Sequence, residues 1–321
     1  MKVKHLELIF QSNRRVEESV VTSTFTAILE RIAAPALARA EIHVNELVVR
    51  IENRSFPPTA VSITTAQGKR YEFDAVVVTA PLGWLKRHGS AFEPPLPPEL
   101  KHSISAISVG HLEKIYVNFS CAFWRSDFSS SPNIAREGNE DSYPGYTNWI
   151  APSYAFDTNP NSWPQEAYDL SAYAAPNTHP TLLFYTYGDC SAHIASHVYG
   201  QPRSAQDAFL KSFFEPYYSR LPGYDPFDPM CQPKAFLATT WQFDELAGFG
   251  SYCNFQVGIE NADECVERIR IGCPERLIWF AGEHAAPEEE MGTVAGAYLS
   301  GEAAARKAEE ALRILDKSVG Y

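Results

Sequence analysis

The sequence predicts a mixed α/β (α+β) fold in two lobes, and three observations support this. Residues 277–284 (LIWFAGEH) followed by residues 292–301 are typical of a buried strand, a turn and the start of a helix built from small residues. Residues 60–65 and 69–80 predict a hairpin that ends in the apolar run 75–78, as in a strand buried on both faces. A chain of 321 residues, 45% of them hydrophobic, exceeds the usual size of a single core.

The first elements follow from local patterns. Residues 22–39 predict a helix with Thr or Ser available as its N-cap, and residues 42–51 alternate as a strand. The hairpin should turn at residues 66–69, which include a glycine. After a proline-rich crossing at residues 94–98, a short helix is expected from residue 98 to about residue 107.

The middle of the chain is rich in aromatic residues and predicts short strands, among them residues 114–119 and 182–187. A long loop is expected over residues 126–153 and a helix over residues 205–217. The chain should finish in a helix over residues 293–316, whose last turns are charged and therefore solvated.

Composition excludes several classes of function. A net charge of −12 without a basic stripe does not indicate a nucleic-acid partner. No apolar stretch approaches the roughly 20 residues of a membrane span, and no signal peptide or peroxisomal tripeptide is recognised, so a cytoplasmic location is expected. The six cysteines lack any Cys-x-x-Cys pair, which favours free thiols.

Metal binding is not expected. His193 and His197 would share one face of a helix, but neither the accompanying glutamate of a zinc-binding helix nor a third ligand is evident. The acidic run 288–290 is interpreted as a solvated loop.

Four motifs occur in an order that resembles the flavin-containing amine oxidases, the family of monoamine and polyamine oxidases and flavin histone demethylases. The resemblance covers most of residues 25–310. The motifs are the C-terminal block already described, residues 73–97, residues 110–124, and Trp241 with residues 250–258.

The resemblance implies an FAD-binding Rossmann-like lobe formed by residues 1–108 and 237–321. Residues 109–236 would form a substrate-binding lobe with a mixed β-sheet. Rossmann-like domains open with a strand, a Gly-x-Gly-x-x-Gly turn and a helix, yet the first 40 residues contain no glycine. We therefore expect an incomplete FAD-binding lobe that lacks this N-terminal segment.

The same resemblance implies three catalytic residues, each with a structural alternative. Lys114, which could simply be an edge lysine reaching solvent, would hold the N5 edge of the flavin through water and assist flavin reoxidation or substrate deprotonation. Tyr252, otherwise a half-buried aromatic residue, would form one wall of the cage for the substrate amine. Thr293 occupies the opposite wall, so a cage of two tyrosines is not expected.

Cofactor contacts are also carried over by resemblance, although strand ends and helix starts need small or apolar residues in any case. Val294 would offer its N–H to the pyrimidine edge of the flavin. Ser251 stands where monoamine oxidases carry the cysteine bonded to the flavin, so FAD would be held non-covalently, and Cys253 is interpreted as a structural thiol. The expected cofactor-binding residues are Val48, Thr79, Ala80, Pro81, Trp241, Gly282, Glu283, Thr293 and Val294.

Two functions remain open at this stage. The first is an FAD-dependent amine oxidase that transfers hydride from an amine C–H to flavin N5, with O2 as the electron acceptor. The second is a non-catalytic truncated remnant, or a fragment that depends on a partner chain carrying the missing segment. No motif between residues 120 and 240 separates polyamines from aromatic or secondary amines as the substrate.

Overall fold

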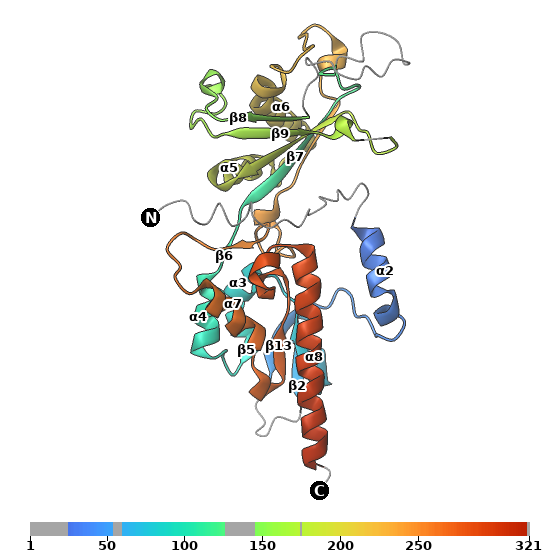
Figure 1. The fold of residues 1–321 in the computed structure, drawn as a ribbon, viewed down its shortest axis with the longest axis vertical. Coiled ribbons are helices and arrows are strands. Elements are labelled where there is room, and N and C mark those ends of the chain that lie inside the picture. The colour runs from blue at the N-terminus through green and yellow to red at the C-terminus, as the bar shows by residue number, and fades with distance from the viewer. Residues whose placement is uncertain (1–24, 54–59, 126–144, 174, 320–321) are drawn as a thin grey trace, which may run out of the picture. The chain divides into compact units, whose positions relative to one another are not determined.

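The computed structural model describes residues 25–53, 60–125, 145–173 and 175–319 (Figure 1). The chain divides into two units, residues 1–45 and residues 46–321, and each is described by itself. The first unit contains helix α2 (Thr26–Leu37), which buries none of its residues. Its N-cap is Phe25, which makes no side-chain cap hydrogen bond, so the expected Thr or Ser cap is wrong. Residues 22–24 of the predicted helix lie outside the described residues.

The second unit begins with a four-stranded sheet in the order β3-β2-β1-β5. Strand β1 starts six residues later than predicted, because Asn45 adopts a positive φ of 59° that interrupts the extended run. The hairpin between β2 and β3 is antiparallel as predicted, whereas β1 and β5 are parallel. The strand bounds are Val48–Glu52 for β1, Val61–Thr65 for β2, Arg70–Phe73 for β3 and Phe92–Glu93 for β5.

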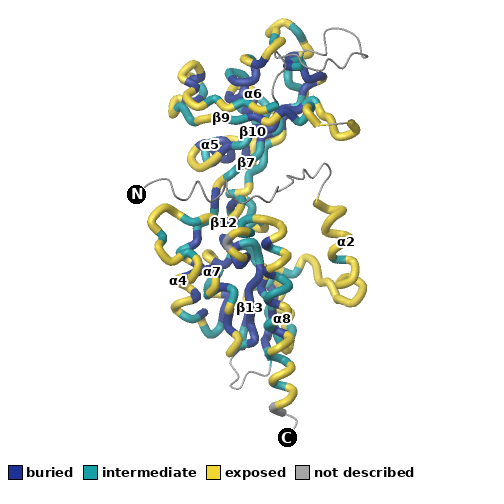
Figure 2. Tube along the Cα trace, viewed as in Figure 1, coloured by how far each residue is buried: buried dark blue, intermediate teal, exposed yellow. Residues whose placement is uncertain are grey.

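A parallel pair joins two segments separated by some 200 residues of sequence. Strands β4 (Val76–Val78) and β13 (Ile278–Phe280) pair with Ile278 opposite Val76 and Phe280 opposite Val78. The predicted apolar run is therefore a strand, but it belongs to a different sheet from β3, and the single predicted arm 69–80 is divided in two. All of β13 is buried, as Figure 2 shows.

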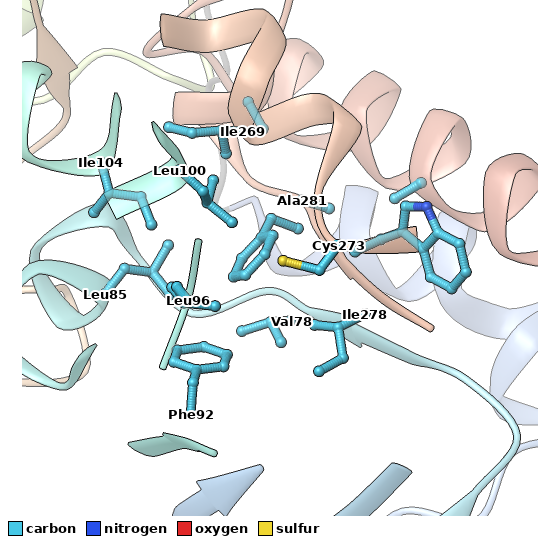
Figure 3. Packing of buried hydrophobic residues seen from close by; sticks show 14 of the residues in the cluster. Val78, Leu85, Phe92, Leu96, Leu100, Ile104, Ile269, Cys273, Ile278 and Ala281 are labelled. Carbon is cyan, nitrogen blue, oxygen red and sulfur yellow. The ribbon is translucent and has the colours of Figure 1, made fainter. Parts of the chain in front are cut away.

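Helices pack around these two sheets and complete the first hydrophobic core. Leu100 and Ile104 of α4 meet Ile269 of α7 beside the β4–β13 pair (Figure 3). Helix α7 was not predicted, because half of its ten residues are charged and only three are buried. The helices are α3 (Leu82–Arg87), α4 (Pro98–Ala106), α7 (Ala262–Ile271) and α8 (Val294–Val319), of which α4 and α8 match the prediction closely.

The second core lies under a five-stranded sheet in the order β11-β7-β10-β9-β8. The mixed fold class is confirmed, with the refinement that all four pairings of this sheet are antiparallel and the mixed sheet is β3-β2-β1-β5. Strand β8 falls inside the predicted loop 126–153, and its Trp149 stacks on buried Phe184. The strand bounds are Leu112–Asn118 for β7, Tyr146–Trp149 for β8, Gln165–Asp169 for β9, Thr181–Tyr187 for β10 and Ala235–Ala238 for β11.

The two faces of this sheet differ in character, because side chains alternate along each strand. Ile115 and Val117 are fully buried in a core shared with α5 (Gly188–Val198) and α6 (Arg203–Tyr218). The opposite face carries polar and aromatic side chains that are partly exposed. Helix α6 was predicted and α5 was not.

A short two-stranded pairing connects the sequence segments that flank the second core. Strand β6 (Ser108–Val109) pairs antiparallel with β12 (Cys253–Asn254). All six cysteines, including Cys253, are buried and free. Among the helices of the described residues, none combines the length and apolar character that a membrane crossing requires.

Close backbone contact at Gly83 ties α3 to the loop that precedes β12. A Cβ atom at Gly83 would lie 1.6 Å from the carbonyl oxygen of Gly248. Gly248 itself has a φ of 76°, and a Cβ there would lie 2.5 Å from the Cβ of Pro81. The two segments can approach this closely because both positions are glycine, which has no Cβ atom.

We expect Gly83→Ala to lower the free energy of unfolding by about 1–3 kcal/mol, because the backbone must move to admit the methyl group. Urea unfolding followed by tryptophan fluorescence would measure this change. Gly89→Ala is the matched control, since among the described residues no atom beyond its two chain neighbours lies within 4 Å of a Cβ at Gly89. Equal losses in the two variants would contradict the steric explanation.

Candidate functional site

The turn after β13 is fixed by a glycine and a serine. Gly282 has a φ of 152°, and a Cβ there would lie 2.6 Å from the ring of His284. Its N–H donates to Ser300 Oγ at 2.9 Å, and the same hydroxyl lies 2.9 Å from the carbonyl oxygen of Gly282. Because Ser300 belongs to α8, this clamp fixes the helix against the turn.

Helix α8 begins at Val294, twelve residues after Gly282, and its start is capped by Thr293. Its Oγ1 accepts the N–H of Gly296 at 2.9 Å and donates to the carbonyl oxygen of Glu290 at 2.7 Å. Within the described residues, the N–H groups of Val294 and Ala295 have no hydrogen-bond partner. Free N–H groups and the positive end of the helix dipole together favour an anionic or electron-rich ligand at this point.

Tyr252 lies beside this helix start. A Cβ at Gly292, the residue before Thr293, would lie 3.3 Å from Cδ2 of Tyr252. The carbonyl oxygen of Tyr252 accepts the N–H of Gly110 at 2.7 Å. The structure therefore brings together two of the three predicted catalytic residues, Tyr252 and Thr293.

Ser251 is engaged by the backbone on the other side of the β6–β12 pairing. Its hydroxyl accepts the N–H of Leu112 at 3.1 Å and donates to the carbonyl oxygen of Gly110 at 3.0 Å. Sequence reasoning treated this residue only as the replacement of a flavin-binding cysteine and missed its structural role.

Lys114 lies on the partly exposed face of β7, opposite Tyr185 of β10. Its ammonium nitrogen lies 5.6 Å from the centre of the Tyr185 ring. Its backbone N–H donates to Thr239 Oγ1 at 2.8 Å, and that hydroxyl donates to Oε2 of Glu113 at 2.6 Å. Glu113 is 1% exposed and was not singled out from the sequence. The pattern that could have found it is a carboxylate at an inward-facing position of a strand whose residues alternate between buried and partly exposed.

Glu283 connects the turn to β12 by a charge-assisted hydrogen bond. Its carboxylate accepts the N–H of Cys253 at 3.1 Å, so the Gly282–Glu283 turn and the Tyr252 segment are held together. Burial and the neighbouring Glu283 carboxylate raise the pKa of the Cys253 thiol, which agrees with an inert structural role.

The other predicted cofactor contacts lie where separate elements end or begin. Thr79 is exposed, Ala80 is half-buried and Pro81 is the N-cap of α3. Trp241 opens a 3₁₀ turn (Trp241–Phe243) and is 37% exposed. Val48 begins β1 and is half-buried.

His284 is a buried histidine that sequence reasoning did not select. It is fully buried, and neither ring nitrogen has a hydrogen-bond partner in the described part of the chain. Desolvation lowers its pKa to about 4, so the imidazole is neutral near pH 7. The two histidines considered for metal binding, His193 and His197, share α5 with ring centres 4.3 Å apart. No group of three metal-ligating side chains occurs among the residues that the structure describes.

Comparisons with known proteins identify the family of this chain. The model of the family described as flavin containing amine oxidoreductase matches residues 5–308, and the chain belongs to that family. Polyamine oxidase 3 of Oryza sativa subsp. japonica is 28% identical over 270 residues, which are 84% of this chain and 45% of that protein. Lysine-specific histone demethylase 1 homolog 3 of Oryza sativa subsp. indica is 25% identical over 241 residues, which are 75% of this chain and 25% of that protein.

Solved structures show the same fold. Cyclohexylamine oxidase from Brevibacterium oxydans IH-35A superposes with a TM-score of 0.57 at 20% identity, covering 88% of this chain and 52% of that one. The chain thus spans about half the length of the polyamine oxidase and the solved structure that it matches.

The flavin cofactor that the family implies fits one part of this site. The N–H groups of Val294 and Ala295, which have no hydrogen-bond partner in the described part of the chain, can receive the electron-rich edge of a flavin beside Tyr252. No glycine-rich turn leading from a strand into a helix, which would hold the pyrophosphate, occurs among the described residues.

We expect Thr293→Ala to destabilise the chain by about 1 kcal/mol, because Gly296 loses the acceptor that caps α8. Thr293→Ser keeps the hydroxyl, so its free energy of unfolding should remain within a few tenths of a kcal/mol of that of the unsubstituted chain. Denaturant unfolding of both variants tests the capping role, and equal losses for serine and alanine would argue against it.

The lowered pKa of His284 predicts a loss of stability in acid. In the unfolded chain histidine binds a proton near pH 6.5, whereas folded His284 stays neutral until about pH 4. The contribution of neutral His284 to the free energy of unfolding, on the order of 3 kcal/mol, is therefore fully present above pH 6.5 and is lost as the pH falls toward 4. Unfolding free energies of His284→Leu should fall less steeply over this interval than those of the chain itself or of the exposed control His102→Gln. Parallel pH profiles would contradict this.

Proposed function

We propose that this chain carries the flavin end and the substrate face of an FAD-dependent amine oxidoreductase. The proposal is carried by the N–H groups of Val294 and Ala295, which find no partner among the residues that the structure describes and lie next to Tyr252. The chain is also a member of the flavin amine oxidoreductase family. The reaction is oxidation of a small-molecule amine at its α-C–H, with O2 as the final electron acceptor. Bound FAD would supply the hydride-accepting chemistry.

The roles of the side chains follow from their surroundings. Tyr252, 38% exposed beside Gly292, offers an aromatic wall against which an amine can pack. Lys114 is a proton donor and acceptor on the same side of β7 as Tyr185, and its backbone is fixed through Thr239 and Glu113. Thr293 aligns the first turn of α8, so its contribution to catalysis is to position the N–H groups that follow it.

Non-covalent binding of FAD is supported by Ser251. A serine hydroxyl cannot form the thioether that a cysteine at this position would make. Here the hydroxyl is already used by Leu112 and Gly110. Val48, Thr79, Ala80, Pro81, Trp241, Gly282, Glu283 and Val294 complete the proposed set of cofactor contacts.

A second candidate function is favoured by one specific feature, the open edge of β13. Leu277 and Ala281 bond to β4, and Ile278 exchanges backbone bonds with Cys273. Successive backbone groups point to opposite edges of a strand, so Phe280 faces away from β4. Its N–H and C=O have no partner among the described residues. A chain that depends on a partner to add a strand and a glycine-rich phosphate turn here is the alternative to an autonomous enzyme.

We expect FAD to bind this chain more weakly than about 1 µM, because the described residues supply no pyrophosphate cradle. Equilibrium dialysis measures the affinity, and absorption spectra after gel filtration show whether FAD co-elutes. At saturating FAD, amine-dependent bleaching of the flavin bands supports the oxidoreductase. Its absence with a panel of primary and secondary amines would favour the partner-dependent alternative.

Lys114→Met should slow reoxidation of the reduced flavin by O2 by about 100-fold, because the proton-transferring group is removed. Stopped-flow absorbance with saturating FAD resolves this phase. Lys211→Met, which removes an exposed lysine of α6, is the control. Reoxidation at the rate of the unsubstituted chain would contradict the role of Lys114.

A further inference from the structure

The partly exposed face of the five-stranded sheet carries one carboxylate surrounded by tyrosines. Glu166 of β9 lies opposite Tyr185 of β10 in the sheet register. Around it stand Tyr146 of β8, Tyr168 of β9 and Tyr187 of β10, each 39–49% exposed. Residues directly opposite in antiparallel strands project to the same face, so these side chains form one surface.

Hydrogen bonds and ring contacts hold this surface together. The hydroxyls of Tyr146 and Tyr187 donate to different oxygens of the Glu166 carboxylate, the first at 3.1 Å. The rings of Tyr146 and Tyr168 lie 4.9 Å apart, and those of Tyr168 and Tyr185 lie 5.4 Å apart. The tyrosines thus position the carboxylate and form a continuous aromatic wall.

Glu166 has no cationic partner among the described residues. Its neighbours across the sheet are Tyr185 and Asn148, not a lysine or arginine. A carboxylate with two phenol donors retains acceptor positions on both oxygens. Burial and the Glu166 carboxylate raise the pKa of Tyr187, so this phenol remains a neutral donor and the negative charge stays on Glu166.

This surface continues toward the residues proposed for catalysis. Lys114 lies opposite Tyr185 on the strand next to it, so Lys114 and Glu166 are separated by two strand spacings, about 10 Å. Tyr187, at the end of β10, is close enough to Tyr252 for that phenol to add a small contribution to the raised pKa of Tyr187. A ligand held at Tyr252 and Lys114 can therefore extend along the face to Glu166.

We propose that Glu166, with Tyr146, Tyr168, Tyr185 and Tyr187, binds a second ammonium group of the substrate and so selects diamines over monoamines. This inference rests on the proposed function, because the first amine is taken to lie at Tyr252. The carboxylate provides a charge-assisted hydrogen bond, and the tyrosine faces attract the cation. A neutral or singly charged amine would leave this subsite unused.

Calorimetric titration of the full chain without FAD tests the subsite directly. The probes are 1,4-diaminobutane and butylamine, at equal ionic strength. We expect the diamine to bind about tenfold more tightly than the monoamine, and Glu166→Gln to remove that difference while changing butylamine affinity less than about twofold. Glu166→Asp, which keeps the charge, should restore part of the preference.

Glu302→Gln is the matched control, since Glu302 also accepts a hydrogen bond from a tyrosine, Tyr298, on the exposed side of α8. It should bind both probes like the unsubstituted chain, and circular dichroism would verify that every variant is folded. Equal affinities of the unsubstituted chain for the two probes, or an unchanged preference in Glu166→Gln, would overturn the proposal.

Failure of the subsite and failure of the proposed function give different results. Diamine preference that depends on Glu166, without flavin bleaching by any amine at saturating FAD, supports the subsite and rejects the oxidoreductase. Flavin bleaching by both amines with equal apparent affinity, in the chain and in Glu166→Gln alike, supports the oxidoreductase and rejects the subsite.

Discussion

Parallel pairing of β4 with β13 is the constraint on which the candidate site depends. Both strands are only three residues long, and they are joined by backbone hydrogen bonds between segments 200 residues apart. Because parallel strands end at the same edge, residues 79–81 and residues 281–283 emerge side by side. A shift of this register would move the turn at Gly282, and with it the start of α8 that Ser300 fixes to that turn.

Polar contacts then convert this alignment into a defined site. Glu283 holds the backbone of Cys253, Ser251 holds Gly110 and Leu112, and Thr239 links Lys114 to the buried Glu113. Each bond connects segments that are distant in sequence, and each satisfies a polar group inside or beside a core. The five-stranded sheet and the turn at Gly282 are therefore coupled through the side chains of Glu283, Ser251 and Thr239.

The sequence predicted elements with strong periodicity and missed those defined by their tertiary partners. Helices α4 and α8 carry clear apolar faces and boundary signals, whereas half of the residues of α7 are charged and it is stabilised by burying Cys265, Val266 and Ile269 against its neighbours. For the site, motifs singled out Lys114 and Tyr252, and the catalytic roles of these two residues stay predictions. The alternation of β7 marks Glu113 as an inward carboxylate, but its partner Thr239 lies 126 residues away. The contact of Ser251 with Leu112 spans 139 residues and the burial of His284 depends on how α8 packs, so no local pattern signals either of them.

The distribution of the two cores has a consequence for synthesis of the chain on the ribosome. The described members of the second core all lie between residues 115 and 238, whereas those of the first lie in residues 48–109 and 253–315. At about 5–20 residues per second, β4 is translated about 10–40 s before β13. During this interval the apolar residues Val76–Val78 lack their partner strand. We therefore expect the second core to fold first, while the apolar residues of the incomplete first core remain accessible to chaperones.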